Sequence, residues 1–134
     1  MQEFESTWWS INLLPDWHAE QGVSCTTLWS DDGVGALQVS AYKKTDESVS
    51  EKDISELSEG GYPYGAEVKS DRSGVFKGIQ ASFSENGKYW RKWWLCSDSL
   101  MLFITYNCDV EDQRIEVEKV EQMISTLNPK VPAV

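Results

Sequence analysis

Few side chains in this chain could break or form bonds, and none has the partners that such chemistry needs. The one histidine, His18, is predicted to lie in the tight turn after Trp17. No second histidine suggests a metal site, and no serine or cysteine motif marks a nucleophile. The three thiols, Cys25, Cys96 and Cys108, are too scattered for metal sites or redox motifs. We therefore expect no catalytic residue, no metal, no cofactor and no disulfide.

Acidic and glycine-rich segments were the next candidates for chemistry. Asp31-Asp32-Gly33 lacks the alternating acidic ligands and the closing glutamate of a calcium loop, so it is interpreted as a turn. Gly33-Val34-Gly35 and Gly60-Gly61 lack the strand, glycine loop and helix that cradle a phosphate. An enzyme of unknown class stays an alternative, and it would need a water-excluded cleft with a perturbed carboxylate or thiol.

Tryptophan is the least ordinary feature of the composition, with seven residues in 134. Adjacent tryptophans on a strand point to opposite faces, so they cannot both be buried if only one face of the sheet is covered. The excess indicates either a sheet covered on both faces or an aromatic contact surface. The seven are Trp8, Trp9, Trp17, Trp29, Trp90, Trp93 and Trp94.

The candidate binding residues come from one hairpin, predicted as strands Lys88–Cys96 and Leu100–Asn107. A loop symmetric about Asp98 would place Trp93 opposite Phe103. Small ligand pockets combine an aromatic floor with convergent polar groups, and the alternative is simple solvation of the hairpin. The predicted group shares one face at the open end of the hairpin and consists of Tyr89, Arg91, Trp93, Thr105 and Asn107.

Alternation and turn residues predict a mainly antiparallel sheet of about six strands in an α/β (α+β) domain. The opening segment Glu5–Leu13 mixes β-branched and aromatic residues and stops before Pro15. A turn is expected at Leu14–Trp17. Besides the hairpin, the other predicted strands are Val23–Trp29, Gly35–Lys43, Ala66–Ser70 and Val75–Ser84.

Two helices are predicted to sandwich this sheet, because both faces of the hairpin are apolar and need cover. Ser48 with Glu51 and Ser50 with Asp53 are both capping-box candidates, which indicates a short helix over about Ser50–Glu59. A long C-terminal helix is expected over Val110–Leu127. Its predicted core stripe consists of Ile115, Val120, Met123, Ile124 and Leu127.

Length and charge narrow the classes of partner. A chain of 134 residues with 40% hydrophobic content is expected to form one domain over residues 1–134, with a tail from Lys130 onward that is loose or laid on the surface. Its net charge of −10 repels nucleic acid and anionic membrane; the charge either attracts a basic protein or serves solubility alone. The first twenty residues contain neither a basic start nor an unbroken apolar stretch, so a soluble, cytoplasmic protein is expected.

The order of these elements resembles the PsbP-like fold, shared by the extrinsic photosystem II subunit, a nuclear-import factor acting on Ran, and bacterial domains of unknown function. The similarity is carried by Leu14-Pro15-Asp16-Trp17, Gly35–Ser40, Phe103–Tyr106 and Ile124–Leu127. It implies an antiparallel sheet between helices over most of the chain. Members of that group mostly bind or assemble, which favours a binding protein over an enzyme by analogy.

Three functional classes follow from the sequence. The first is a protein-interaction module, such as an immunity-like or antitoxin-like inhibitor whose acidic surface caps a basic toxin. The second is a small-molecule or peptide binder that uses a tryptophan-lined pocket, and the third is an enzyme of unknown class. We expect the first. The sequence leaves the oligomeric state open.

Overall fold

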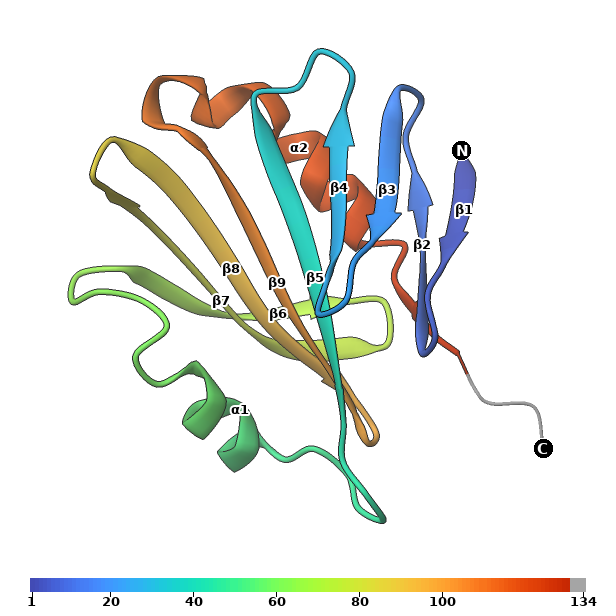
Figure 1. The fold of residues 1–134 in the computed structure, drawn as a ribbon. Helices are drawn as coiled ribbons and strands as arrows, with labels where there is room; N and C mark the ends of the chain where they lie inside the picture. The colour runs from blue at the N-terminus through green and yellow to red at the C-terminus, as the bar shows by residue number, and fades with distance from the viewer. Residues whose placement is uncertain (131–134) are drawn as a thin grey trace.

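The computed structural model describes residues 1–130, which form two antiparallel sheets and two α-helices (Figure 1). The larger sheet has the strand order β3-β4-β5-β9-β8-β7-β6, and the smaller has the order β1-β2-β10. The prediction for the tail falls mainly on residues 131–134, outside the described part. The strands are β1 (Gln2–Glu5), β2 (Trp9–Leu13), β3 (Trp17–Gln21), β4 (Thr26–Ser30), β5 (Gly35–Lys43), β6 (Glu67–Ser73), β7 (Phe76–Glu85), β8 (Lys88–Ser97), β9 (Leu100–Asp109) and β10 (Asn128–Pro129).

The opening segment forms more strands than the sequence predicted. Glu5–Leu13 is not one strand, because the chain turns between β1 and β2, where the Ser6 N–H donates to the Trp9 carbonyl at 2.8 Å. Strand β3 was not predicted at all, and β4 begins at Thr26, after the predicted start at Val23. These short strands raise the number in the two sheets above the expected six.

Helices cover both faces of the larger sheet, as predicted. The short helix α1 (Glu51–Ser58) lies against β7 and β8 on one face. On the other face lie α2 (Gln113–Ile124), which follows a 3₁₀ turn η1 (Val110–Asp112), and the small sheet (Figure 1). We call these two sides the α1 face and the α2 face.

The main core lies on the α2 face, where α2 docks through Val120, Met123 and Ile124, with Leu127 just beyond its end. Ile115 was predicted in this stripe and is 56% exposed, so that prediction is wrong. The buried stripe runs back from Val120 by one helical repeat to Glu116, one residue away from Ile115. Large buried partners from the sheets include Trp9, Ile11, Leu28, Leu37, Phe76, Trp93, Leu95, Leu102, Ile104 and Tyr106.

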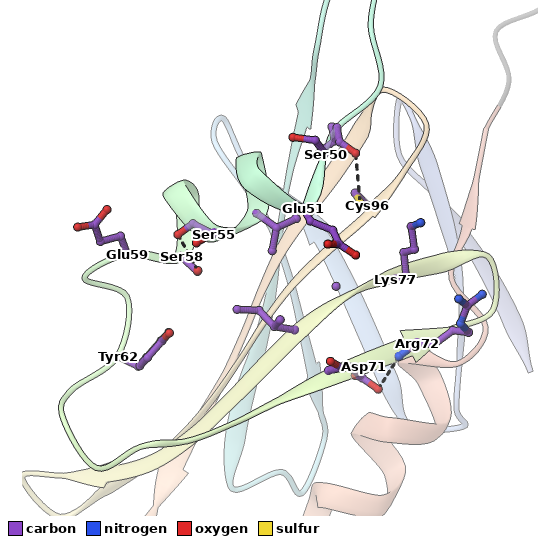
Figure 2. Close-up of a pocket in the computed structure, with 15 residues that line it drawn as sticks. Ser50, Glu51, Ser55, Ser58, Glu59, Tyr62, Asp71, Arg72, Lys77 and Cys96 are labelled. Carbon is purple, nitrogen blue, oxygen red and sulfur yellow. Dashed lines mark hydrogen bonds between the residues drawn. The ribbon is translucent and has the colours of Figure 1, made fainter.

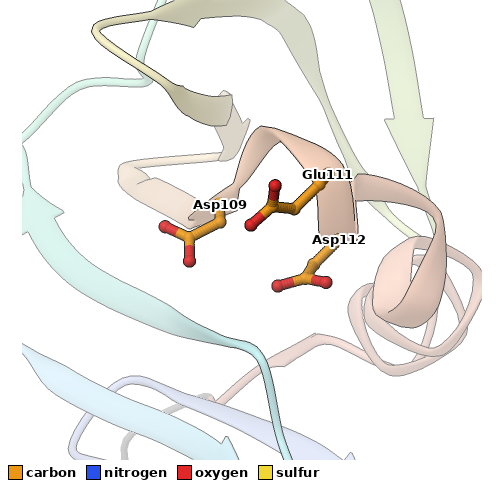
Figure 3. A group of neighbouring side chains, drawn as sticks. All are labelled: Asp109, Glu111 and Asp112. Carbon is orange, nitrogen blue, oxygen red and sulfur yellow. The ribbon is translucent and has the colours of Figure 1, made fainter.

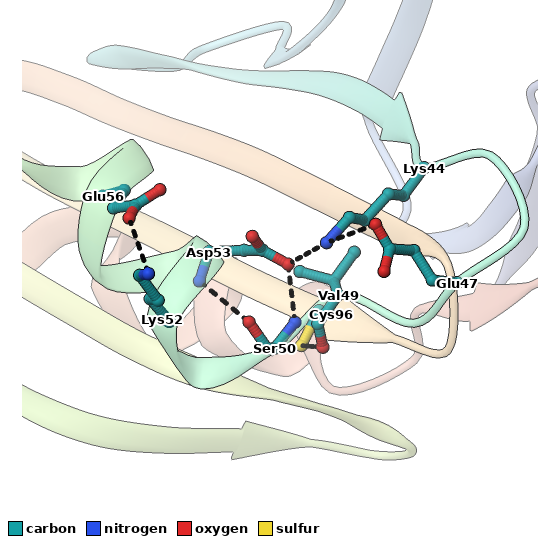
Figure 4. Close-up of polar contacts among 8 residues, drawn as sticks. All are labelled: Lys44, Glu47, Val49, Ser50, Lys52, Asp53, Glu56 and Cys96. Carbon is teal, nitrogen blue, oxygen red and sulfur yellow. Dashed lines mark hydrogen bonds and ion pairs between the residues drawn. The ribbon is translucent and has the colours of Figure 1, made fainter.

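A smaller core lies beneath α1, whose predicted bounds and cap are confirmed. Ser50 is the N-cap: its hydroxyl accepts the Asp53 N–H at 3.1 Å, and the Asp53 carboxylate accepts the Ser50 N–H at 2.9 Å. Lys44 adds an ion pair to Asp53 at 2.7 Å (Figure 4). These contacts tie the start of α1 to the end of β5, and Ile54 packs against Trp94.

Candidate functional site

The β8–β9 hairpin differs from its predicted register by one residue. The turn contains only Asp98 and Ser99, with Asp98 at φ +50°, so Ser97 pairs with Leu100. Trp93 therefore lies opposite Ile104. A shift of one residue changes which face each partner shares. The prediction that all five candidate residues share one face is therefore wrong: Tyr89, Arg91 and Trp93 lie on the α2 face, and Thr105 and Asn107 on the α1 face.

Arg91 is bound within the protein on the α2 face. Its Nε and Nη2 donate to the Gln80 Oε1 at 3.0 and 2.8 Å, and it forms an ion pair with Glu121. The guanidinium also lies 5.4 Å from the centre of the Trp93 ring. Tyr89 is half-buried beside them, and burial raises the pKa of its hydroxyl. These contacts neutralise a buried charge, which is a structural role, and the binding role of this trio stays a prediction.

Thr105 and Asn107 belong to a different surface, the part of the α1 face that α1 leaves uncovered. One row of directly paired residues crosses it from Lys92 through Thr105 and Gln38 to Thr27. The next row crosses from Phe83 through Trp90 and Asn107 to Ala36. We call this surface the open sheet face; its members are Thr27, Trp29, Ala36, Gln38, Phe83, Trp90, Lys92, Phe103, Thr105 and Asn107, each partly or fully exposed.

The open sheet face has an aromatic wall and a polar floor. On β7 and β8, Phe83 and Trp90 stack with ring centres 6.5 Å apart, and the Lys92 ammonium lies 5.6 and 5.3 Å from them. Burial of Lys92 lowers its pKa. Trp29 stands on β4, across the floor formed by β5 and β9. A shallow cavity of about 280 Å³ lies on this floor, bounded in part by Gln38, Trp90, Lys92 and Thr105.

Carboxylates gather at one end of the open sheet face. Asp109, Glu111 and Asp112 bring their side-chain oxygens within 4.8 Å of one another (Figure 3). We call these three carboxylates the acidic end. Lys88 pairs with Asp109 at 2.7 Å, so one carboxylate of the cluster is already neutralised.

A larger groove lies between α1 and the strands β6 and β7, with a volume of about 900 Å³ (Figure 2). Glu51 and Glu59 border it from the side of α1, and Arg72 and Lys77 from the side of the sheet. Ile54, Ile79, Tyr62 and the Cys96 thiol supply less polar surface. The groove therefore combines an apolar interior with charges of both signs at its rim. The sequence analysis did not find it, because its residues come from four separate segments.

Glu116 is the most deeply buried carboxylate that the sequence analysis missed. It is 3% exposed, and its Oε1 accepts the Tyr106 hydroxyl at 2.8 Å and the Gly35 N–H at 3.1 Å. Burial and this hydrogen bond raise the pKa of Tyr106. A side chain at Gly35 would collide with the Asn107 carbonyl. The arrangement joins the start of α2 to β5 and β9 and leaves no room for a ligand there.

The candidate nucleophiles are not activated. Burial raises the pKa of the Cys96 and Cys108 thiols, which disfavours the reactive thiolate. His18 Nε2 lies 2.7 Å from the Asp31 carboxylate and its ring lies against Trp29, neither of which is a nucleophile. His18 was placed in a tight turn by the sequence analysis and lies instead in β3. The open sheet face and the groove therefore provide hydrogen-bonding groups, aromatic rings and charges for binding.

Solved structures similar to this chain include the following two. One is a protein of Bacteroides thetaiotaomicron VPI-5482, crystallised at 1.50 Å resolution, with a TM-score of 0.71 and 22% identity. The match covers 98% of this chain and 50% of that one, so this chain spans about half its length. The other is the solution structure of cyanobacterial PsbP (CyanoP) from Synechocystis sp. PCC 6803, with a TM-score of 0.47, 8% identity, and coverage of 96% and 92%.

A PsbP structure is thus among those that this chain resembles, as the sequence analysis predicted. At these identities the likeness concerns the fold alone. No family model matches the sequence. No curated protein matches it either. The surfaces described above are therefore the basis for any functional conclusion.

The helices were also compared with the dimensions of a bilayer. Among residues 1–130, no helix is both long and apolar enough to cross a membrane.

Proposed function

We propose that this chain is a protein-interaction module whose open sheet face and acidic end bind a basic amphipathic helix of a partner protein. The observation that supports it most directly is that Trp90 and Phe83 stand partly exposed on a half of the sheet that neither helix of the described residues covers. Interfaces are enriched in partly exposed aromatic residues that a partner can bury. The partner's apolar side would contact these rings, and its cationic side would approach the carboxylates.

The dimensions of the surface fit this occupant. From β4 to β8 the sheet crosses three strand spacings, about 14 Å, which accommodates a helix about 10–12 Å in diameter. Trp29 and Trp90 would stand on either side of the helix, above the floor of Gln38, Thr105 and Asn107. Such a surface would suit an immunity-type or antitoxin-type inhibitor that caps a basic toxin.

The charge supports a basic partner. The chain carries 12 basic and 22 acidic residues, and three of the acidic ones, Asp109, Glu111 and Asp112, form the acidic end beside the row of Trp90 and Asn107. A negative surface accelerates association with a cation and repels nucleic acid. The pKa values of the two buried thiols, Cys96 and Cys108, are raised by burial; this favours binding over catalysis and suits a reducing compartment, so we propose the cytoplasm as the setting.

A designed helix tests the proposal before the natural partner is known. The probe is an amphipathic peptide of lysine and leucine, and its counterpart carries glutamate in place of lysine. We expect the lysine peptide alone to bind and to change tryptophan fluorescence. Raising salt from ~0.15 to ~0.5 M should slow its association, because exposed charges are screened beyond about 8 Å at the lower concentration. Equal binding of both peptides would contradict the proposal.

Variants locate the contact. Trp90→Ala and Trp29→Ala should accelerate dissociation of the peptide, since truncated aromatic anchors act mainly on that rate. Trp8→Ala is the matched control, because Trp8 is also partly exposed and lies on the α2 face, under the Lys43 ammonium. Capture of the natural partner from lysate should show the same dependence. A partner that Trp90→Ala leaves unaffected would contradict the assignment of the surface.

The groove beside α1 favours a second candidate function, binding of a small molecule or peptide. Its volume of about 900 Å³ lies within the range of ligand sites, and Arg72 and Lys77 face Glu51 across it. This candidate predicts that a ligand bound in the groove stabilises the folded chain and raises its Tm. A screen of charged small molecules by thermal shift, repeated with Lys77→Ala, tests it.

A further inference from the structure

The free edge of β6 carries a pattern that is complementary to a second copy of itself. We infer that two copies of this chain pair antiparallel through β6, with a two-fold axis at Ser70. Strand β6 ends the larger sheet, and within residues 1–130 it pairs only with β7. The inference does not rest on the proposed function, because the open sheet face lies on other strands.

The backbone of β6 is available for this pairing. Ser73 and Phe76 flank a two-residue turn, which makes them a hydrogen-bonded pair of the β6–β7 ladder. Alternate residues then direct their N–H and C=O groups away from β7, and these are Val68, Ser70 and Arg72. The Arg72 N–H confirms this direction, since it donates to the neighbouring Asp71 carboxylate at 2.9 Å and not to a strand.

An antiparallel partner must pair outward-directed residues with each other, which leaves few registers. With the axis at Ser70, Val68 lies opposite Arg72 of the second copy, and Lys69 lies opposite Asp71. The two ion pairs occupy the closer, non-hydrogen-bonded positions of the ladder. Asp71 becomes free for this contact, because the Arg72 N–H would donate to the backbone of the second copy.

The neighbouring registers are excluded by like charges. An axis at Lys69 would put Lys69 opposite Lys69 and Glu67 opposite Asp71, and an axis at Asp71 would put the two Asp71 carboxylates together. Charges on an edge strand commonly prevent pairing, and a row of lysines would do so here. In β6 the signs alternate, so one register is attractive and its neighbours are repulsive. This specificity is what a defined self-interface requires.

Reversal of charge tests both the surface and the register. Sedimentation velocity from micromolar to near-millimolar protein should show a concentration-dependent dimer. Lys69→Glu and Asp71→Lys should each weaken it by about tenfold or more, because each places two like-charged pairs at the axis. The double variant restores both pairs with exchanged positions and should regain the parent affinity. Lys119→Glu, on the exposed side of α2, is the control of equal charge.

An engineered disulfide crosslink tests the same pairing even if the dimer is weak. In a Cys25→Ser background, Ser70→Cys places two thiols at the axis and should give a disulfide-linked dimer under mild oxidation. Ser84→Cys, exposed on β7, should not. A chain that stays monomeric, a dimer unchanged by Lys69→Glu, a double variant that is not restored, or an absent Ser70→Cys crosslink would each overturn the inference. Circular dichroism of each variant confirms folding.

Discussion

The buried contact between Tyr106 and Glu116 gives the sharpest prediction about stability. Tyr106→Phe removes the hydroxyl that donates to the Glu116 Oε1 at 2.8 Å and leaves the ring in the core. A hydrogen bond to a charged group contributes about 1.5–3 kcal/mol, so a loss of about 2 kcal/mol is expected. For 134 residues the unfolding entropy is about 0.28 kcal/mol/K, which converts this loss into a fall in Tm of about 7 °C.

The assay is urea unfolding followed by tryptophan fluorescence, with an unchanged m-value as evidence that the folded and unfolded states are otherwise alike. Tyr89→Phe is the matched control, since Tyr89 is half-buried and none of the hydrogen bonds among residues 1–130 involves its hydroxyl. Combination with Glu116→Leu, which removes the acceptor, forms a double-mutant cycle that isolates the pair. A Tyr106→Phe protein within about 0.5 kcal/mol of the parent would refute the reasoning.

The same contact predicts a dependence on alkaline pH. Burial and the hydrogen bond raise the pKa of Tyr106 above its ordinary value of 10.0. The folded state therefore favours the protonated hydroxyl, and its contribution to stability is complete below pH 10 and is lost as pH rises above 10. The Phe variant cannot lose this contribution. Its stability should fall less steeply than that of the parent above pH 10.

Three further predictions concern the helices and the thiols. Ile124→Asp should cost several kcal/mol because it buries an unpaired charge, whereas Ile115→Asp on the exposed side should leave Tm nearly unchanged. The hydrogen bond from Lys44 and then that from the Ser50 backbone lower the pKa of Asp53 from 3.8 to about 2. The ionised cap therefore stabilises the folded state above pH 4, and this contribution is lost as the pH falls toward 2. The stability of Asp53→Asn, followed by circular dichroism, should fall less steeply with decreasing pH than that of the parent. The two buried cysteines should resist alkylation at neutral pH until urea unfolds the chain, and reduction should leave the protein's mass unchanged.

The sequence predicted elements well where local signals agree with burial. Strand β5 has the predicted bounds, Gly35–Lys43, and α1 follows the cap formed by Ser50 and Asp53. Strand β3 could not be predicted, because only Trp17 and Ala19 of its five residues face the core and the alternation is too short. In α2, a buried glutamate at position 116 interrupts the apolar stripe, and the pattern therefore shifted to Ile115.

Only part of the candidate site was predicted from the sequence, because the length of the β8–β9 turn was predicted wrongly. The sequence is compatible with a turn of either three or two residues between β8 and β9. In the structure the turn has two residues, and Asp98 adopts a positive φ in it. That choice separates Thr105 and Asn107 from the other three candidates and places Trp90 and Lys92 beside them. The seven tryptophans fit both readings offered by the sequence: four are buried, and Trp8, Trp29 and Trp90 are partly exposed.

The two proposed surfaces are compatible with each other. Directly opposite residues of an antiparallel pair point to the same face, so a two-fold axis at Ser70 would run perpendicular to the joined sheets. Both α1 faces would then point the same way, since Ser70 lies opposite Ile79, a residue packed in the α1-side core. Each copy would present Trp29 and Trp90 on that side, and β6 would lie between the axis and the aromatic wall on β7 and β8. A dimer would thus bind two helices, and loss of the dimer would leave each single contact intact while removing the gain from binding both together.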